Sequence, residues 1–499
     1  MSAACHILAI DQGTASTKSL LIDEDGRIVG TSADENYDID ASYPRPGWVE
    51  YDPEQILETI CASAKAAVYN AELTWDDVAA VGLANHGETV IAFDADDGQP
   101  IYPAISWQDR RGEELIHAWR EEGLDDLVRQ ETGLRLDAYF SASKLAWIVR
   151  NVPAAKKLLK KNRLRLGTSD AWLLWQLTGG RVFVTDVATA SRTMLLNLKS
   201  LGWSDSLIDA FGLRRDCLPQ IKANATRIGE TVEDTFGFQL PITGLCVDQQ
   251  AALFGHGCLH MGETKATYGT GCFLLSNIGK SPGSRATGLL SCVGWNIDGN
   301  LSYVFDGGVY SAGSLVQWLV ELGLVGDMRE LSHLAADVDD TNGVVMIPAF
   351  SGLAAPHWKG QARACWTGMS LGTDRRHLVR AALESIAYRV KDIVSSMKAA
   401  DITIHRLHAD GGLTRCEFLM QFQADLLGIP VVCANMLERT ALGVGLMAGI
   451  GCELWDGVSD LPHPNKDIKT YSPRAETKTR YGQQYERWRS ICLEVAKWD

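Results

Sequence analysis

Two similar hairpins, about half a chain apart, constrain the fold more than any other feature of this 499-residue sequence. Near the start, "LAIDQGTASTKSLLID" (8–23) places an acidic residue and a Gly-Thr turn between two apolar runs. Much later, "KATYGTGCFLLSNIGKSPG" (265–283) repeats the order of strand, Gly-Thr turn and strand. The turns begin at Gly13 and Gly269. Two lobes, each opening with such a hairpin, explain both the spacing and the length.

The length also favours two domains, because one hydrophobic core seldom grows beyond about 250–300 residues. We place the boundary between residues 1–250 and residues 251–499. Strand-like runs at 6–10, 17–23 and 28–32 predict an antiparallel meander at the start. Strands and helices alternate through both halves, which predicts an α/β fold.

Further elements follow from the periodicity of apolar residues. Helices are predicted at 53–71, 142–153, 170–180, 311–324, 377–400 and 416–428. Short strands are predicted at 404–410 and 429–434. In the tail, a helical stripe predicts a helix that packs on the rest of the chain; it consists of Tyr481, Tyr485, Trp488, Cys492 and Val495.

Composition excludes several kinds of partner. The net charge of −15 argues against a nucleic-acid or anionic-membrane surface. The sequence has no run of 18 apolar residues, and its N-terminus lacks the pattern of a signal peptide. The 12 cysteines are scattered without a CxxC pair, so we expect reduced, structural thiols. A soluble, cytoplasmic protein is expected.

The first turn has the chemistry of a phosphate site. Gly13 allows a close approach of backbone to ligand, and backbone N–H groups with nearby hydroxyls can bind phosphate oxygens. Asp11 is a hard oxygen donor suited to Mg²⁺. An ordinary solvated turn explains this one motif equally well, but the second hairpin favours a pair of phosphate-binding turns.

Two other glycine-rich segments have competing interpretations. "ADGGLTR" (409–415) could present a helix N-terminus to a flat ligand, although a tight strand-to-helix connection explains it better when it is taken alone. "GVGLMA" (443–448) matches a dinucleotide fingerprint but follows no hydrophobic strand. Close helix packing is the better interpretation of the second segment.

Together these pieces resemble the FGGY carbohydrate kinases, most closely the members that phosphorylate glycerol. The resemblance runs in order over nearly the whole chain, through "ILAIDQGTAST", "YPRPGWVEYDPEQI", "PIYPAISWQDRR", "GTSDAWLLWQLTGGRVFVTDVATASRTML", "VDQQAALFGHGC", "TYGTGCFLL" and "DGGLTRCEFLMQFQADLLG". It implies two actin-like (ribonuclease H-like) lobes with mixed sheets and an active site in the cleft between them. It also implies ATP, Mg²⁺, a small polyol substrate and a homodimer.

The resemblance assigns roles to individual positions. Asp248 would be the general base at the substrate hydroxyl, whereas without the resemblance it would be an ordinary helix N-cap. Asp11 would serve Mg²⁺. The polyol would contact Glu88, Tyr139, Gln249, Trp107 and Phe273 in addition to Asp248. The nucleotide would contact Thr14, Ala15, Ser16, Lys18, Thr270, Gly313, Gln317, Gly412 and Cys416.

Departures from the family pattern concern the substrate. Glycerol-phosphorylating members usually have an arginine where this chain has Gly87, and the loss of a bidentate donor weakens binding unless another group replaces it. Asp109 in "WQDRR" is closer to the sugar-specific members. The first expectation is glycerol, converted to sn-glycerol 3-phosphate, and the alternative is a four- or five-carbon polyol or ketose. A nucleotide-switched chaperone or filament protein is a third possibility, from a different functional class.

Overall fold

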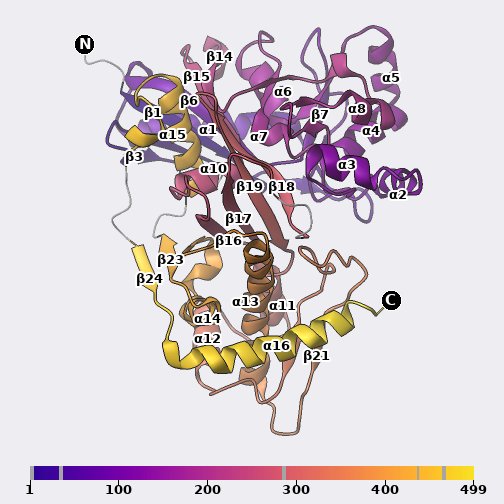
Figure 1. Cartoon of the computed structure of the whole chain (residues 1–499). Coiled ribbons are helices and arrows are strands. Elements are labelled where there is room, and N and C mark those ends of the chain that lie inside the picture. Colours follow the sequence, from indigo (N-terminus) through magenta and orange to yellow (C-terminus); the bar gives the residue numbers. More distant parts are fainter. Residues whose placement is uncertain (1–4, 33–36, 284–287, 435–437, 463–467, 499) are drawn as a thin grey trace.

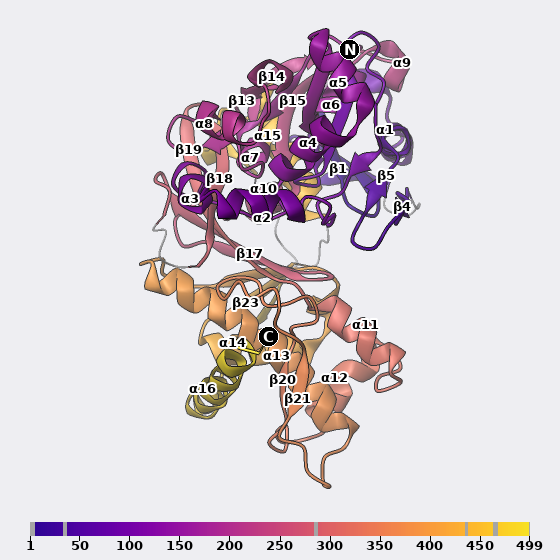
Figure 2. The ribbon, with the colours of Figure 1, turned by 90° about the vertical axis from the view of Figure 1, so that its right-hand side faces the viewer.

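The chain folds into two α/β lobes, as the sequence predicts. The computed structural model describes residues 5–32, 37–283, 288–434, 438–462 and 468–498. In Figure 1 the elements of the first half form the upper lobe, and most of the second half forms the lower lobe. A quarter turn of the molecule, shown in Figure 2, keeps the two lobes apart, with β17 passing between them.

One sheet of thirteen strands runs through both lobes. Its order is β24 (Ile468–Tyr471), β23 (Val431–Ala434), β22 (Leu407–Asp410), β16 (Thr264–Tyr268), β17 (Cys272–Gly279), β19 (Asn300–Val309), β18 (Leu290–Ile297), β14 (Ala225–Glu230), β15 (Pro241–Val247), β6 (Val78–Asn85), β1 (His6–Gln12), β2 (Thr17–Ile22) and β3 (Ile28–Thr31). Parallel pairing of β14 with β18, through Ala225 and Ile297, joins the two halves of the sheet.

Both predicted hairpins are present. β1 and β2 are antiparallel, with Asp11 opposite Lys18, and β3 completes the predicted meander. β16 and β17 are antiparallel and end on the pair Tyr268 and Cys272, so the second Gly-Thr turn lies between these two residues. A smaller sheet in the first half has the order β4 (Ala41–Ser42), β5 (Glu50–Tyr51), β8 (Ala104–Ile105), β7 (Val90–Asp94) and β9 (Leu164–Thr168).

The predicted helices are present as α1, α4, α6, α11, α13, α14 and α16, with ends that differ by a few residues, and further helices lie between them. In the first half they are α1 (Pro53–Asn70), α2 (Glu113–Glu121), α3 (Asp125–Thr132), α4 (Ser141–Asn151), α5 (Pro153–Lys160), α6 (Ser169–Leu177), α7 (Val187–Ala190), α8 (Asp205–Ala210), α9 (Glu233–Phe236) and α10 (Asp248–Gly255). In the second half they are α11 (Gly313–Glu321), α12 (Met328–Ala336), α13 (Arg375–Ala399), α14 (Glu417–Leu427), α15 (Arg439–Gly451) and α16 (Lys478–Val495).

Helix α15 returns from the second half of the chain to the first lobe. It packs on α10 and on strands β1, β6 and β15, and in Figure 1 it lies beside β1. The contact is close, because a Cβ on Gly443 would lie 1.8 Å from the carbonyl oxygen of Ala251. This is the close helix packing predicted for residues 443–448. Helix α15 therefore lies beyond the predicted boundary at residue 250 but packs on strands that precede it.

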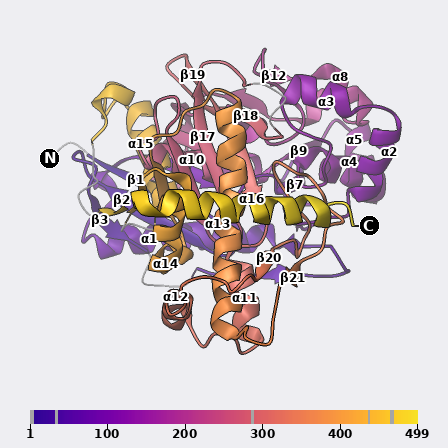
Figure 3. The same ribbon diagram turned by 60° about the horizontal axis from the view of Figure 1, so that its bottom comes forward.

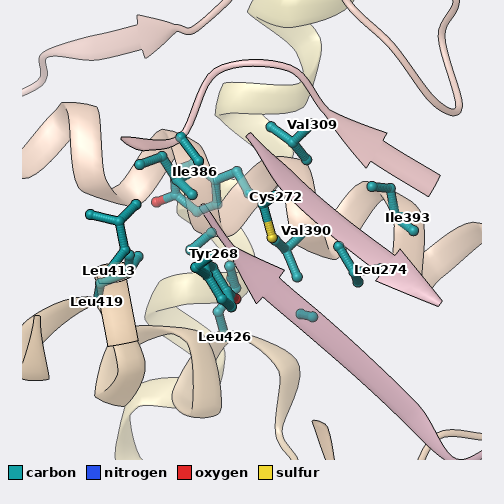
Figure 4. Close-up of a cluster of buried hydrophobic side chains, with 14 of the residues drawn as sticks. Tyr268, Cys272, Leu274, Val309, Ile386, Val390, Ile393, Leu413, Leu419 and Leu426 are labelled. Carbon is teal, nitrogen blue, oxygen red and sulfur yellow. The ribbon is translucent and has the colours of Figure 1, made fainter. Parts of the chain in front are cut away.

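The second lobe has its own apolar core. Figure 4 shows part of it, with Tyr268 and Cys272 from the second hairpin packed among leucine, isoleucine and valine side chains. Helix α16 lies across α13 in Figure 3. All five residues of its predicted stripe are buried, which confirms that this helix packs on the lobe.

The cysteines are free thiols, and eight of them are buried. Within the described ranges, no helix is long and apolar enough to span a membrane.

Candidate active site

Three neighbouring parallel strands of the large sheet, β15, β6 and β1, end side by side in the first lobe. Gln12 of β1 lies opposite Asn85 of β6, and Asn85 lies opposite Val247 of β15. The residues that follow these strand ends leave the sheet at the same edge. The first Gly-Thr turn, the segment that contains Glu88, and Asp248 are thereby brought together, although they are far apart in sequence.

Asp11 is an acid in an acidic neighbourhood. Burial, together with the negative charges of Asp248 and Glu438, raises the pKa of Asp11 to about 8, and Lys18 opposes this rise only in part. Glu438 forms an ion pair with Lys18 at 2.9 Å. A carboxylate under such repulsion is stabilised by a cation, so the donor chemistry fits Mg²⁺. Within the described part of the chain, no three potential metal-binding side chains cluster, so such an ion would need water and phosphate oxygens as further ligands.

The first turn is tight and is linked to the predicted substrate wall. The backbone N–H of Gly13 donates to the carbonyl of Ser16 at 3.1 Å, and a Cβ on Gly13 would lie 2.9 Å from that oxygen. Ala15 is exposed at the tip of the turn. The Trp107 indole N–H donates to the Thr14 hydroxyl at 3.0 Å. The predicted phosphate turn and the predicted polyol wall are therefore in direct contact.

The second turn is held by the start of α11. The Gly313 N–H donates to the carbonyl of Gly269 at 2.9 Å, and Ser314 donates to that of Thr270 at 3.0 Å. Thr270 is exposed. Gln317 is exposed on the same helix, where its amide donates to Glu321 at 3.3 Å. Three residues predicted for the nucleotide thus belong to one local structure.

The end of β22 lies against the end of β16. Gly411 has φ of +89°, and a Cβ there would lie 2.5 Å from the carbonyl oxygen of Tyr268. Gly412 is exposed and begins a short 3-10 turn instead of the predicted helix. The Cys416 side chain is completely buried in the core of the second lobe, so its thiol presents no surface to a ligand.

A buried arginine, missed by the sequence reasoning, organises the predicted polyol residues. The Arg192 Nε donates to Glu88 at 2.6 Å, and one terminal nitrogen donates to Asp306 at 2.7 Å. The other terminal nitrogen lies 3.5 Å from the Tyr139 hydroxyl. Burial raises the pKa of Glu88, and Arg192 opposes that rise. The only sequence signal for Arg192 is one charge in the motif "ATASRTML".

Aromatic rings border this network. Trp107 and Tyr139 meet edge to face, with ring centroids 5.6 Å apart. Phe273 pairs with Gly308, and a Cβ on Gly308 would lie 3.2 Å from its ring. Gly308 is two residues beyond Asp306 on β19, and alternate residues of a strand share a face. Phe273 is therefore placed on the side of the sheet that carries Asp306.

Asp248 is the first residue of α10, and the N-cap is Val247. Its carboxylate accepts a hydrogen bond from the backbone N–H of Gln249 at 2.7 Å. Burial raises its pKa, while hydrogen bonding and the cations Lys265 and Arg192 act in the opposite direction. The pKa thus lies above the ordinary value for aspartate.

The two departures from the family pattern have different structural settings. A Cβ on Gly87 would lie 2.9 Å from a γ-methyl of Val247, so a valine occupies the space beside the glycine. Asp109 is completely buried, and both of its oxygens accept hydrogen bonds from the guanidinium of Arg111 at 2.8 Å. Asp109 is therefore engaged in a structural ion pair.

The fold and this arrangement define a class of protein. Two Gly-Thr turns on one continuous sheet, an acidic residue at the first turn and a second carboxylate among polar, buried side chains are the components of a phosphotransferase acting on a hydroxyl. Residues 6–255 match the N-terminal domain, and residues 264–452 the C-terminal domain, of the FGGY family of carbohydrate kinases. The chain belongs to this family.

Full-length relatives agree with that assignment. The chain is 41% identical to a glycerol kinase of Burkholderia pseudomallei over 495 residues, which cover 99% of this chain and 98% of that one. It is 40% identical to glycerol kinase 2 of Thermotoga maritima, with 99% of each covered. The crystal structure of Plasmodium falciparum glycerol kinase with ADP superposes with a TM-score of 0.90 at 32% identity, covering 98% of both chains.

Proposed function

We propose that this protein transfers the γ-phosphoryl group of ATP to a terminal hydroxyl of glycerol and forms sn-glycerol 3-phosphate. The observation that carries the proposal is the position of Asp248, at the same sheet edge as Asp11 and Glu88. The relatives named glycerol kinase, about 40% identical over their whole length, support this choice of substrate.

In the mechanism, Asp248 accepts the proton of the attacking hydroxyl as the new P–O bond forms. Glu88, Tyr139 and Gln249 hold the other polyol oxygens, because a buried polar group left without a partner costs about 1–3 kcal/mol. Trp107 and Phe273 cover the carbon skeleton. The pKa of Asp248, raised by burial, makes it a stronger base than an exposed aspartate.

The nucleotide is proposed to lie between the two Gly-Thr turns. Thr14, Ser16 and Lys18 would face the phosphates, with Ala15 contributing its backbone. Thr270, Gly313, Gln317 and Gly412 would contact the rest of the nucleotide, whereas Cys416 is completely buried and is assigned no contact. Asp11 would hold Mg²⁺, which when bound neutralises phosphate charge.

One observation favours a second candidate, a four- or five-carbon polyol or ketose. No side chain at position 87 reaches toward the substrate, so one hydroxyl of glycerol lacks a cationic partner there. Val247 fills part of this space, however, and Asp109, the other reason to consider a sugar, is engaged by Arg111. Both findings leave glycerol as the first candidate.

A coupled assay with glycerol, erythritol, ribitol and xylulose tests the proposal. We expect glycerol to give the highest kcat/KM and ATP consumption to depend on an added polyol. Turnover of a longer substrate without turnover of glycerol would establish the second candidate. ATP hydrolysis that ignores every polyol would contradict both.

We also propose a homodimer and a cytoplasmic location, both supported by the likeness to the family. Light scattering coupled to size-exclusion chromatography measures the mass directly. A mass of a single 54.5 kDa chain would contradict the dimer.

A further inference from the structure

Lys265 is a buried cation between the predicted polyol and nucleotide residues. It lies on β16, the strand that leads into the second Gly-Thr turn, and its side chain is completely buried. Burial lowers its pKa, and a buried ammonium is retained only where it is well partnered. Its position therefore calls for a role beyond filling space.

The ammonium group bridges two segments that are distant in sequence. Nζ donates to the side-chain oxygen of Gln249 at 2.5 Å and to the Thr267 hydroxyl at 2.8 Å. Gln249 is on the first turn of α10, next to the proposed base. Thr267 is the residue before Tyr268, where the second turn begins. One side chain thus fixes a polyol-binding residue against a nucleotide-binding strand.

The surrounding charges explain why a cation is placed here. Asp410, Asp248 and Asp306 all act on Lys265 and favour its charged form. Asp410 lies opposite Thr267 on the neighbouring strand and immediately precedes Gly411. The Asp410 carboxylate also lies 2.6 Å from Nε2 of His256, the residue that caps the C-terminal end of α10. Both ends of α10 are therefore connected to the strands that carry the nucleotide elements.

We infer that Lys265 is a positioning residue that orients Gln249 toward the polyol and couples the polyol site to the nucleotide site. The inference rests on the proposed function, since it assigns Gln249 to the substrate. Without the ammonium group, the Gln249 amide loses its charged donor and rotates freely, so polyol binding weakens while Asp248 remains in place. The expected signature is a higher KM for the polyol with a much smaller change in kcat.

Steady-state kinetics of Lys265→Met, Lys265→Gln and Lys265→Arg, compared with wild type, test the inference. We expect the first two variants to raise the KM for glycerol by about ten-fold or more, the loss expected for one charged hydrogen bond, and the arginine variant to recover part of it. Glutamine is included because its amide keeps a polar atom at this depth and preserves the fold where methionine does not. Thr264→Val is the matched control: Thr264 lies next to Lys265 on β16, and the substitution removes its buried hydrogen bonds to Ser276 of β17 and to the carbonyl of Gly262 while leaving the Lys265 contacts intact.

A double-mutant cycle with Gln249→Ala isolates the pair. If Lys265 acts through Gln249, its loss adds little to the KM of the Gln249→Ala variant. The inference would be overturned if the effects of the Lys265 and Gln249 substitutions on the glycerol KM multiplied in the double variant. It would also be overturned if the glycerol KM stayed within two-fold of wild type in both Lys265→Met and Lys265→Gln. Absence of glycerol turnover in the wild type would instead refute the proposed function, and the two failures are therefore distinguishable.

Discussion

At the scale of single residues, buried charges set the chemistry of this site. Asp11, Glu88 and Asp248 all have pKa values raised by burial, and each lies near another acid. Arg192 opposes the rise in the pKa of Glu88 and of Asp248, and Lys265 opposes that of Asp248. Each of these carboxylates binds a proton more tightly than an exposed one, and the cations are held in place by their hydrogen bonds. Phosphoryl transfer to a hydroxyl depends on such fixed placement of charged groups.

Replacement of Asp248 by asparagine removes the proposed base. We expect kcat to fall by about 10²–10⁴-fold, the usual contribution of general base catalysis, with little change in the KM for ATP. In the wild type, activity should fall as the pH decreases through a pKa above 3.8, because the protonated carboxyl cannot accept a proton. Initial rates across pH for wild type, Asp248→Asn and the exposed control Asp234→Asn measure this. Full activity in Asp248→Asn would exclude it as the base.

Position 87 tests how the substrate is selected. Gly87→Arg alone should reduce stability by about 1–3 kcal/mol and lower kcat/KM for glycerol, because its side chain collides with Val247 and displaces it. With Val247→Ala added, the arginine gains room and can donate to the polyol, so the glycerol KM should fall below that of wild type. The single variant Val247→Ala is the control, because it opens the same space without adding the arginine. A double variant no better than Gly87→Arg would show that Val247 does not shape the pocket.

From the sequence alone, candidate site residues could be proposed where residue types form local motifs, but not where residues act on one another from distant parts of the chain. Asp11, Thr14 and Thr270 could be proposed because each lies in or directly before a recognisable Gly-Thr turn. Arg192 and Lys265 could not, since a single cation in an apolar run becomes informative only when Glu88 or Gln249 is brought against it. Contacts between sequence-distant residues are set by the tertiary fold.

At the scale of elements, α15 shows how small residues position the site. Gly443 lies against Ala251 of α10, and a Cβ on Gly255 of α10 would lie 2.1 Å from the carbonyl oxygen of Arg439. The two helices can approach this closely only because neither position carries a side chain. The close packing fixes α10, and with it Asp248 at its first turn. The sequence indicated close packing at residues 443–448, but the partner helix became evident only in the structure.

Gly443→Val should disrupt this packing. The added side chain must push α15 away from α10, so we expect a loss of at least about 1–3 kcal/mol in stability, together with reduced kcat. The matched control is Gly482→Ala on α16, where a Cβ meets nothing within 4 Å and helix propensity predicts a gain of about 0.5–1 kcal/mol. Thermal unfolding measures both. Equal melting temperatures for Gly443→Val and wild type would refute the proposed constraint.

At the scale of the whole molecule, the two lobes are interdependent parts of one fold. The large sheet is continuous through both, and α15 crosses from the second half to cover strands of the first. Residues of β17, β18 and β19 belong to the same apolar cluster as residues of the first lobe. The half-chain spacing of the hairpins predicted two lobes correctly, but nothing in that spacing indicated which segments return.

A fragment of residues 1–255 should therefore fail to fold cooperatively. It lacks α15, whose buried side chains include Leu442, Val444, Leu446, Met447 and Ile450. Burial of each contributes about 1.5–3 kcal/mol, and their sum rivals the net stability of about 5–15 kcal/mol typical of a folded protein. Calorimetry should show one transition for the full chain and none for the fragment. Fusing residues 438–462 to the fragment through a flexible linker should restore part of its protection from amide exchange, whereas a fragment that melts like the full chain would show that the first lobe folds without α15.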